Sequence, residues 1–171
     1  MGTDNLHHKK RAKSAKALAR RNAKKSGYAR VLIVCEGEKT EPKYFKGLID
    51  CYKLNNANIE IYGDDNSDPR SIVKYAKNRY KTEQHTGNTF DKVFCVFDKD
   101  AHAHYANAKN AINEAKQKNV YYAITSVPCF EYWVLLHFKY MRKPFNRCDE
   151  VLSELKNYMP DYTKAKGNIF K

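Results

Sequence analysis

The sequence predicts an α/β fold: a mostly parallel sheet of about four strands with helices on both faces. Five apolar residues in a row, from Val31 to Cys35, suit a strand that is covered on both sides. A second run of the same kind extends from Val93 to Phe97. Helical apolar spacing lies between the expected strands, and this alternation implies parallel strands joined by right-handed crossovers.

Local signals place the elements of the first half of the chain. A core-packing helix is expected from Thr40, a suitable N-cap, because apolar residues follow at helical spacing. Residues 58–62 alternate as a strand does. Asp68 is expected to cap the next helix, with Pro69 at its first position and its end near Glu83. The second apolar strand is then expected over residues 92–97.

The second half of the chain continues the alternation. A surface helix is expected from about His104 to Lys118, and a strand from Val120 to Thr125. Residues 130–138 are dense in large apolar side chains, which predicts a buried helix. A last amphipathic helix is expected over residues 148–158, and the tail from Asp161 to Lys171 has no clear pattern.

Composition fits one globular domain. The chain has 171 residues, of which 42% are hydrophobic and 13% aromatic, and no apolar run approaches the ~18 residues of a membrane span. Its five cysteines are scattered and never form a CxxC pair, so neither a disulfide framework nor a zinc site is expected. The basic start lacks the apolar core of a secretory signal, which favours a reducing cytoplasmic setting.

The net charge of +13 is concentrated at the start of the chain. We expect residues 1–29 to form a basic flexible arm ahead of a folded domain at residues 30–171. Such an arm is either a solubilising tail or a contact for phosphate backbones, because clustered bases release counterions when they bind nucleic acid. The candidate nucleic-acid-binding residues are Lys9, Lys10, Arg11, Lys13, Arg20, Arg21, Lys24 and Lys25.

Acidic residues follow both apolar strands. Glu36 comes directly after the first strand, and Asp98 and Asp100 come after the second. If the two strands are neighbours, their carboxyl ends bring these side chains to one edge of the sheet, where open α/β sheets place their active sites. Asp98 and Asp100 are two residues apart and would point to the same side, and Glu36 would complete an oxygen-only shell for Mg²⁺ or Mn²⁺.

Such a shell would support phosphoryl or phosphodiester transfer. Closely packed carboxylates raise one another's pKa unless a cation neutralises them, and a magnesium ion with few protein ligands keeps waters and binds phosphate oxygens. A metal-bound water would then attack, with a nearby carboxylate as general base. The alternative is that these acids are only solvated loop carboxylates.

Other polar residues leave two interpretations open. Glu38 and Glu41 flank a helix start, where they either serve the helix dipole or bind metal. Glu131 lies in the most apolar segment, so it is either a site acid or paired with a buried partner such as an arginine. His137 is expected to be a satisfied core histidine. Lys99 would either counter the aspartates or touch a phosphate.

Three motifs in order resemble the RloB family: VLIVCEGEKTEPKYF at residues 31–45, VFCVFDKD at 93–100 and SVPCFEYWVLLHF at 126–138. That family has a TOPRIM-like fold and is associated with bacterial and phage-defence operons. The resemblance implies a metal-dependent nuclease domain in which Glu36 is an acid or base and metal ligand, and Asp98 and Asp100 bind Mg²⁺.

The resemblance implies further site residues and a partner. Glu41 is the nearest match to a further helix acid, one residue farther from Glu36 than the family pattern. Glu131 lies in a motif where Val127 replaces the usual asparagine. Family members usually work with RloA, an ABC-type ATPase. They also continue into a helix beyond Asn168, so we expect this chain to be short at its C-terminus.

The function expected from the residues and the resemblance is that of a Mg²⁺-dependent TOPRIM-type endonuclease. It would hydrolyse DNA or RNA, tRNA included, as the effector of an anti-phage system in the cytoplasm. Two alternatives come from other classes: a receiver-like phosphoacceptor module and a catalytically inactive nucleic-acid-binding subunit. Receivers carry a lone acceptor aspartate and a lysine after the fifth strand, which the paired aspartates and Glu131 fit poorly.

Overall fold

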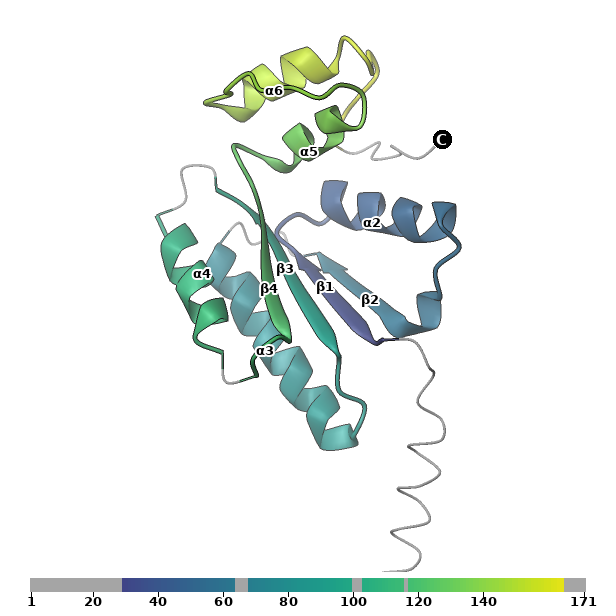
Figure 1. Cartoon of the computed structure of the whole chain (residues 1–171), viewed down its shortest axis with the longest axis vertical. Coiled ribbons are helices and arrows are strands. Elements are labelled where there is room, and N and C mark those ends of the chain that lie inside the picture. The colour runs from purple at the N-terminus through teal and green to yellow at the C-terminus, as the bar shows by residue number, and fades with distance from the viewer. Residues whose placement is uncertain (1–28, 64–67, 100–102, 116, 165–171) are drawn as a thin grey trace, which may run out of the picture.

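The sheet has four parallel strands in the order β2-β1-β3-β4 (Figure 1). The structure is a computed structural model that describes residues 29–63, 68–99, 103–115 and 117–164. The strands are β1 (Val31–Cys35), β2 (Ile59–Gly63), β3 (Lys92–Asp98) and β4 (Tyr121–Ser126). The predicted α/β class and parallel sheet are confirmed. The arm predicted for residues 1–29 lies outside the described residues, apart from Ala29.

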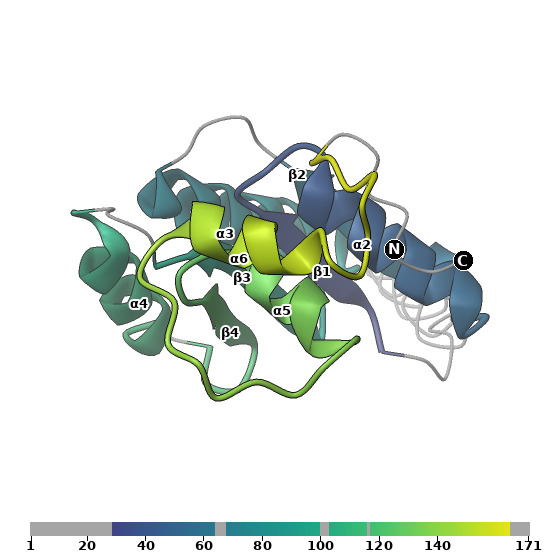
Figure 2. The same cartoon turned by 90° about the horizontal axis from the view of Figure 1, so that it is seen from above.

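Helices cover both faces of this sheet, as predicted. In Figure 1, α3 (Pro69–Thr86) and α4 (Tyr105–Asn113) lie on one face, and α2 (Thr40–Cys51) lies on the other. The short α5 (Phe130–Leu136) and α6 (Cys148–Leu155) lie over the carboxyl ends of the strands, as the view from above shows (Figure 2). One 3₁₀ turn, Asn56–Asn58, precedes β2. The last two helices therefore cover the carboxyl edge of the sheet.

Alternation along the strands builds two apolar cores. Leu32 and Val34 of β1 pack with α3 and α4, in a cluster that also holds Val93, Cys95 and Phe97 of β3. Side chains that point the other way along β1, Ile33 and Cys35, pack with α2, α5 and α6. Because successive strand residues face opposite sides, an unbroken apolar run is what a sheet covered on both faces requires.

The helix starts test two predicted caps. Asp68 caps α3 as predicted: its Oδ1 accepts a 2.9 Å hydrogen bond from the N–H of Arg70, and Pro69 is the first helical residue. Thr40 is not the N-cap of α2, which is Lys39. Thr40 is instead the buried first residue of the helix, and its hydroxyl donates to the carbonyl of Lys164 at 3.3 Å. A tertiary contact therefore replaces the local cap.

All three helices in the second half are shorter than predicted, and α6 ends at Leu155, three residues before the expected end. The surface helix ends at Asn113, five residues before the expected end. The predicted buried helix ends at Leu136, and Trp133 and Phe138 remain 48% and 43% exposed. Because α5 lies at the edge of the sheet, only one side of it meets the core. The indole N–H of Trp133 donates to the hydroxyl of Tyr44 at 2.7 Å, which satisfies its polar end.

The cysteine prediction needs a correction. Cys129 and Cys148 form a disulfide, although their spacing of 19 residues gave no sequence signal for one. Cys129 immediately precedes α5 and Cys148 opens α6, so packing of these helices brings the two sulfurs together. Cys35 and Cys95 are buried small residues in strands, as expected, and Cys51 is exposed.

None of the described helices has both the length and the apolar character needed to cross a membrane.

Candidate active site at the carboxyl edge of the sheet

Glu36 and Asp98 meet where β1 and β3 end. The strands are neighbours in register, with Cys35 opposite Val96, so the residues that follow each strand arrive side by side. The N–H of Glu36 extends the ladder by donating to the carbonyl of Val96 at 3.0 Å. Its carboxylate turns back, and Oε2 accepts a 2.8 Å hydrogen bond from the main-chain N–H of Asp98. The predicted convergence of these two acids is what the sheet produces.

The Asp98 carboxyl lies in a setting that resists ionisation. Burial is the main cause that raises its pKa to about 8, and the charges of Glu41, Glu36 and Glu131 add to the effect. A hydrogen bond from the N–H of Phe130, the first residue of α5, acts in the opposite direction. Asp98 is thus held between the end of β3 and the start of α5, with three carboxylates close enough to repel its charge.

Glu41 is a buried member of this cluster. It is 7% exposed in the first turn of α2, and burial raises its pKa, with further contributions from the charges of Glu131 and Glu36. Its own backbone N–H and Lys164 lower that pKa in part. A Cβ added at Gly37 would lie 2.5 Å from Glu41 Oε2, so glycine at this position leaves room for the carboxylate. A carboxylate that only stabilises the helix dipole can remain exposed, so the burial of Glu41 beside other acids favours the site role.

Glu131 is the most deeply buried acid of the site. It is 2% exposed at the start of α5, and its Oε1 lies 3.6 Å from Lys164 Nζ. The hydroxyl of Tyr162 donates to the same oxygen at 3.5 Å, and Cys148 Sγ lies 3.4 Å from Oε2. Its charged neighbour is therefore Lys164, in place of the arginine given as an example of a buried partner. Burial and the charge of Glu131 raise the pKa of Tyr162 well above its usual range.

The tail residues Tyr162 and Lys164 were missed by sequence reasoning. They lie in a segment with no periodic pattern. A tyrosine or a lysine there does not by itself indicate a contact with Glu131, which lies 31 or 33 positions earlier. Tyr162 is 5% exposed, which shows that this end of the described chain packs into the site. No local signal could have found them.

Several predicted site residues are exposed or lie outside the described chain. Glu38 is exposed, and Lys99 is exposed with its N–H donating to the carbonyl of Ser126 at 2.8 Å. Asp100 and the eight arm bases fall among residues that the structure does not describe. His137, predicted to be a core histidine, is exposed on its residue average, and its Nε2 lies 3.0 Å from the Tyr44 hydroxyl. That prediction is wrong on burial, because α5 ends one residue earlier.

The donor set at this edge suits a hard divalent cation. Glu36, Glu41 and Asp98 offer only carboxylate oxygens, the ligands that Mg²⁺ and Mn²⁺ prefer, and their mutual repulsion would be relieved by a cation. The oxygens of these three acids are spread more widely than the ligand atoms of Cys129, Glu131 and Cys148, which among the described residues all lie within 4.8 Å of one another. The disulfide occupies both sulfurs of that second group.

Comparison with known proteins identifies the family. The family model described as RloB-like protein matches residues 31–171, which include all three motifs and every carboxylate of the cluster. A search of the curated proteins finds no match. The match covers most of the chain, and the chain belongs to the RloB-like family.

Proposed function

We propose that this protein is a metal-dependent nuclease that hydrolyses phosphodiester bonds of nucleic acid. The observation that carries the proposal is the burial of Asp98 among Glu36, Glu41 and Glu131, which raises its pKa to about 8. A folded protein keeps carboxylates together against their repulsion where a cation or a proton-transfer task requires it. The site lies at the carboxyl edge of a parallel sheet, where such folds carry out their chemistry.

Each carboxylate has a role in this proposal. Glu36 and Asp98, with Asp100, would hold Mg²⁺ or Mn²⁺, and the bound ion would supply Lewis acidity and an activated water. Glu41 is buried and has a raised pKa, so its carboxyl group holds a proton more readily than an exposed glutamate does and is the proposed proton-transfer group. Glu131 is anchored by Lys164 and Tyr162 and fixes the start of α5. The N–H of Phe130 in that helix then orients Asp98.

Basic charge makes nucleic acid the proposed substrate. The chain carries 32 lysine and arginine residues against 19 acids, and ten of the bases lie in its first 30 residues. Phosphate contacts of this kind supply affinity without sequence readout. A role in phage defence, a cytoplasmic location and an ABC-type ATPase partner are proposed with it, from the family resemblance.

The proposal is tested with purified full-length protein incubated with duplex DNA and with tRNA, each with Mg²⁺, Mn²⁺ or EDTA. Each reaction is run with and without the ATPase partner. We expect metal-dependent cleavage of one substrate and none in EDTA. No cleavage by the wild-type protein under any of these conditions would refute the nuclease.

The receiver-like alternative predicts a different product. A phosphoacceptor aspartate would take a phosphoryl group from acetyl phosphate in Mg²⁺, which intact-protein mass spectrometry detects. In the structure, Asp98 lies near other acids that repel its charge, and it accepts a hydrogen bond from the N–H of Phe130. We therefore expect no phosphorylated species. An adduct on Asp98 without nuclease activity would favour the receiver.

A further inference from the structure

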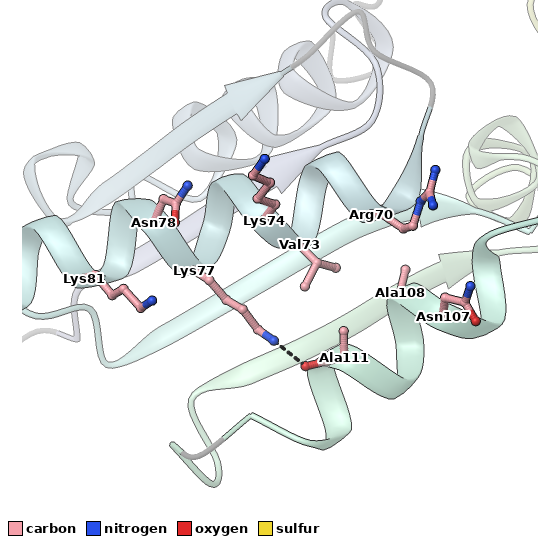
Figure 3. A pocket seen from close by; sticks show the side chains of 9 residues that line it. All are labelled: Arg70, Val73, Lys74, Lys77, Asn78, Lys81, Asn107, Ala108 and Ala111. Atoms are coloured by element: carbon pink, nitrogen blue, oxygen red, sulfur yellow. Dashed lines mark hydrogen bonds between the residues drawn. The ribbon is translucent and has the colours of Figure 1, made fainter.

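A groove between α3 and α4 has cationic walls. It has a volume of about 390 Å³, and Figure 3 shows α3 and α4 supplying the residues that line it. Val73, Ala108 and Ala111 form its apolar part. The polar lining consists of Arg70, Lys74, Lys77, Lys81, Asn78 and Asn107. No acidic residue is among the lining residues, so the groove presents positive charge and amides around a small apolar floor.

The spacing of the four cations follows from the helix. Positions 70, 74, 77 and 81 lie three or four residues apart and therefore share one face of α3. At about 1.5 Å per residue the row from Arg70 to Lys81 extends over about 16 Å. Lys77 Nζ donates to the carbonyl of Ala111 at 2.7 Å and joins the two helices (Figure 3). The row is long enough to meet several charges of an extended ligand.

The single acid within α3 neutralises bases outside the row. Glu83 pairs with Arg79 at 2.6 Å and with Arg30 at 3.0 Å, away from the groove. Arg70 pairs with Asp68 at 2.6 Å and is the compensated member of the row. Lys74 and Lys81 are exposed and have no ion pair within the described part of the chain. On a solvated helix face, lysines are commonly paired with acids four residues away, and on this face of α3 such acids are missing.

One end of the groove lies at the carboxyl edge of the sheet. Both helices follow strands and begin at the carboxyl edge of the sheet, and Arg70 and Asn107 belong to their first turns. The hydroxyl of Tyr105, at the start of α4, donates to Thr125 at 3.2 Å. Thr125 is in register with Phe97, one residue before Asp98. The groove therefore opens toward the end of β3.

The other end lies where the basic N-terminal segment joins the domain. Arg30 is the first base after residues 1–29, and its Nη1 lies 3.0 Å from Glu83, two positions beyond Lys81. Nine further bases precede Arg30 in the sequence.

We propose that the α3–α4 groove binds the phosphodiester backbone of nucleic acid and directs it toward the carboxyl edge of the sheet, where the carboxylates lie. The inference rests on the proposed function in one respect, namely that nucleic acid bound in the groove is guided toward the carboxylates. Lys74 and Lys81 would contact phosphates, Asn78 and Asn107 would donate to backbone oxygens, and the apolar floor would meet sugar carbons. Such contacts read no bases, so the groove binds sequences alike.

The test compares two double variants of the full chain with the same change in net charge. Lys74→Glu/Lys81→Glu alters the groove. Lys46→Glu/Lys156→Glu alters exposed lysines on α2 and at the end of α6, away from the groove. Fluorescence anisotropy with a short fluorescein-labelled duplex DNA and a matched duplex RNA, in EDTA to prevent cleavage, gives Kd between about 50 and 200 mM salt.

We expect the groove variant to bind about tenfold more weakly, and the slope of log K against log salt to lose about one unit per lysine. The control variant should match the wild type. Lys74→Arg/Lys81→Arg keeps the charge and should retain affinity. Because both lysines are exposed, the melting temperatures should be equal, and a variant that melts early is replaced by Lys74→Gln/Lys81→Gln.

If the groove variant binds with the wild-type Kd and salt slope, the groove does not bind nucleic acid. The same conclusion follows if the groove and control variants lose affinity equally, because the loss then reflects net charge alone. Loss of poly-L-glutamate binding with nucleic-acid binding intact would also overturn it, in favour of an acidic protein. The two proposals fail separately. If the groove variant binds more weakly but the wild type cleaves nothing, the nuclease proposal is refuted and the groove proposal stands. If the wild type cleaves nucleic acid but the groove variant binds as the wild type does, the groove proposal is refuted and the nuclease proposal stands.

Discussion

The main-chain N–H of Asp98 donates a 2.8 Å hydrogen bond to Oε2 of Glu36, so the last residue of β3 holds the first acid after β1. The bond crosses between two neighbouring parallel strands at their carboxyl ends. It fixes the Glu36 carboxylate beside an aspartate whose ionisation is opposed by burial and by Glu36 itself. The pair is the geometric centre of the proposed site, and its removal gives the most direct test of the chemistry.

Glu36→Gln should strongly reduce metal-dependent cleavage while leaving the fold intact. The glutamine carbonyl can still accept from the Asp98 N–H, so the change removes the negative charge and retains the hydrogen bond. We expect cleavage to fall by about 10²–10⁴-fold, the range for loss of a positioned catalytic group. Glu38→Gln, at an exposed neighbour, is the matched control. Retained activity in Glu36→Gln would remove Glu36 from the mechanism.

The stability of the metal-free protein should fall as pH rises from about 4 toward 8. The Asp98 carboxyl has an unfolded pKa near 3.8 and a folded pKa of about 8, so in this window the folded state binds more protons than the unfolded state. The free energy of unfolding then decreases with pH. Melting temperatures of wild type and Asp98→Asn in EDTA should converge at acid pH and diverge toward pH 8, with the variant more stable there.

Divalent metal provides the control for that measurement. Mg²⁺ or Mn²⁺ that binds the folded state should raise the wild-type melting temperature at pH 8, because a ligand of the native state adds to its stability. The increase should be smaller in Asp98→Asn. If wild type and variant show the same pH dependence in EDTA, Asp98 does not carry the raised pKa.

Gly63→Ala should destabilise the protein by about 1–3 kcal/mol. A Cβ at this end of β2 would lie 2.5 Å from the carbonyl oxygen of Gly37 and 2.7 Å from Pro42 Cγ, so the loop that carries Glu36 would have to move. Gly47→Ala, in the interior of α2, is the control and should gain about 0.5–1 kcal/mol of helix stability. Urea denaturation measures both changes; equal stability of the two variants would contradict the crowding at Gly63.

Reduction of the Cys129–Cys148 disulfide should lower stability by about 3 kcal/mol, because the bond closes a loop of 19 residues. The melting temperature of the oxidised wild type should fall on addition of reductant. Cys129→Ser/Cys148→Ser should melt at the lower temperature with or without reductant. A wild-type melting curve that ignores reductant would show that the bond does not form in solution.

Several features could be predicted from local sequence because their causes are local. The apolar run 31–35 predicts a strand covered on both faces, and the observed β1 has the same bounds. The Asp68–Pro69 pair predicts the start of α3, since the cap bond spans two residues. The acids that follow β1 and β3 predict the Glu36–Asp98 convergence, because neighbouring parallel strands end at one edge.

The tertiary structure decided the surroundings of those acids. Lys164, Tyr162 and Cys148 reach Glu131 from 17 to 33 positions away, and Glu41 is buried by the packing of α2 against the site. Likewise α3 and α4 form the cationic groove only when they lie side by side. Such contacts depend on which surfaces meet after the chain folds. The sequence by itself determined the strands and the acids at their ends; packing decided their partners, their pKa values and the groove.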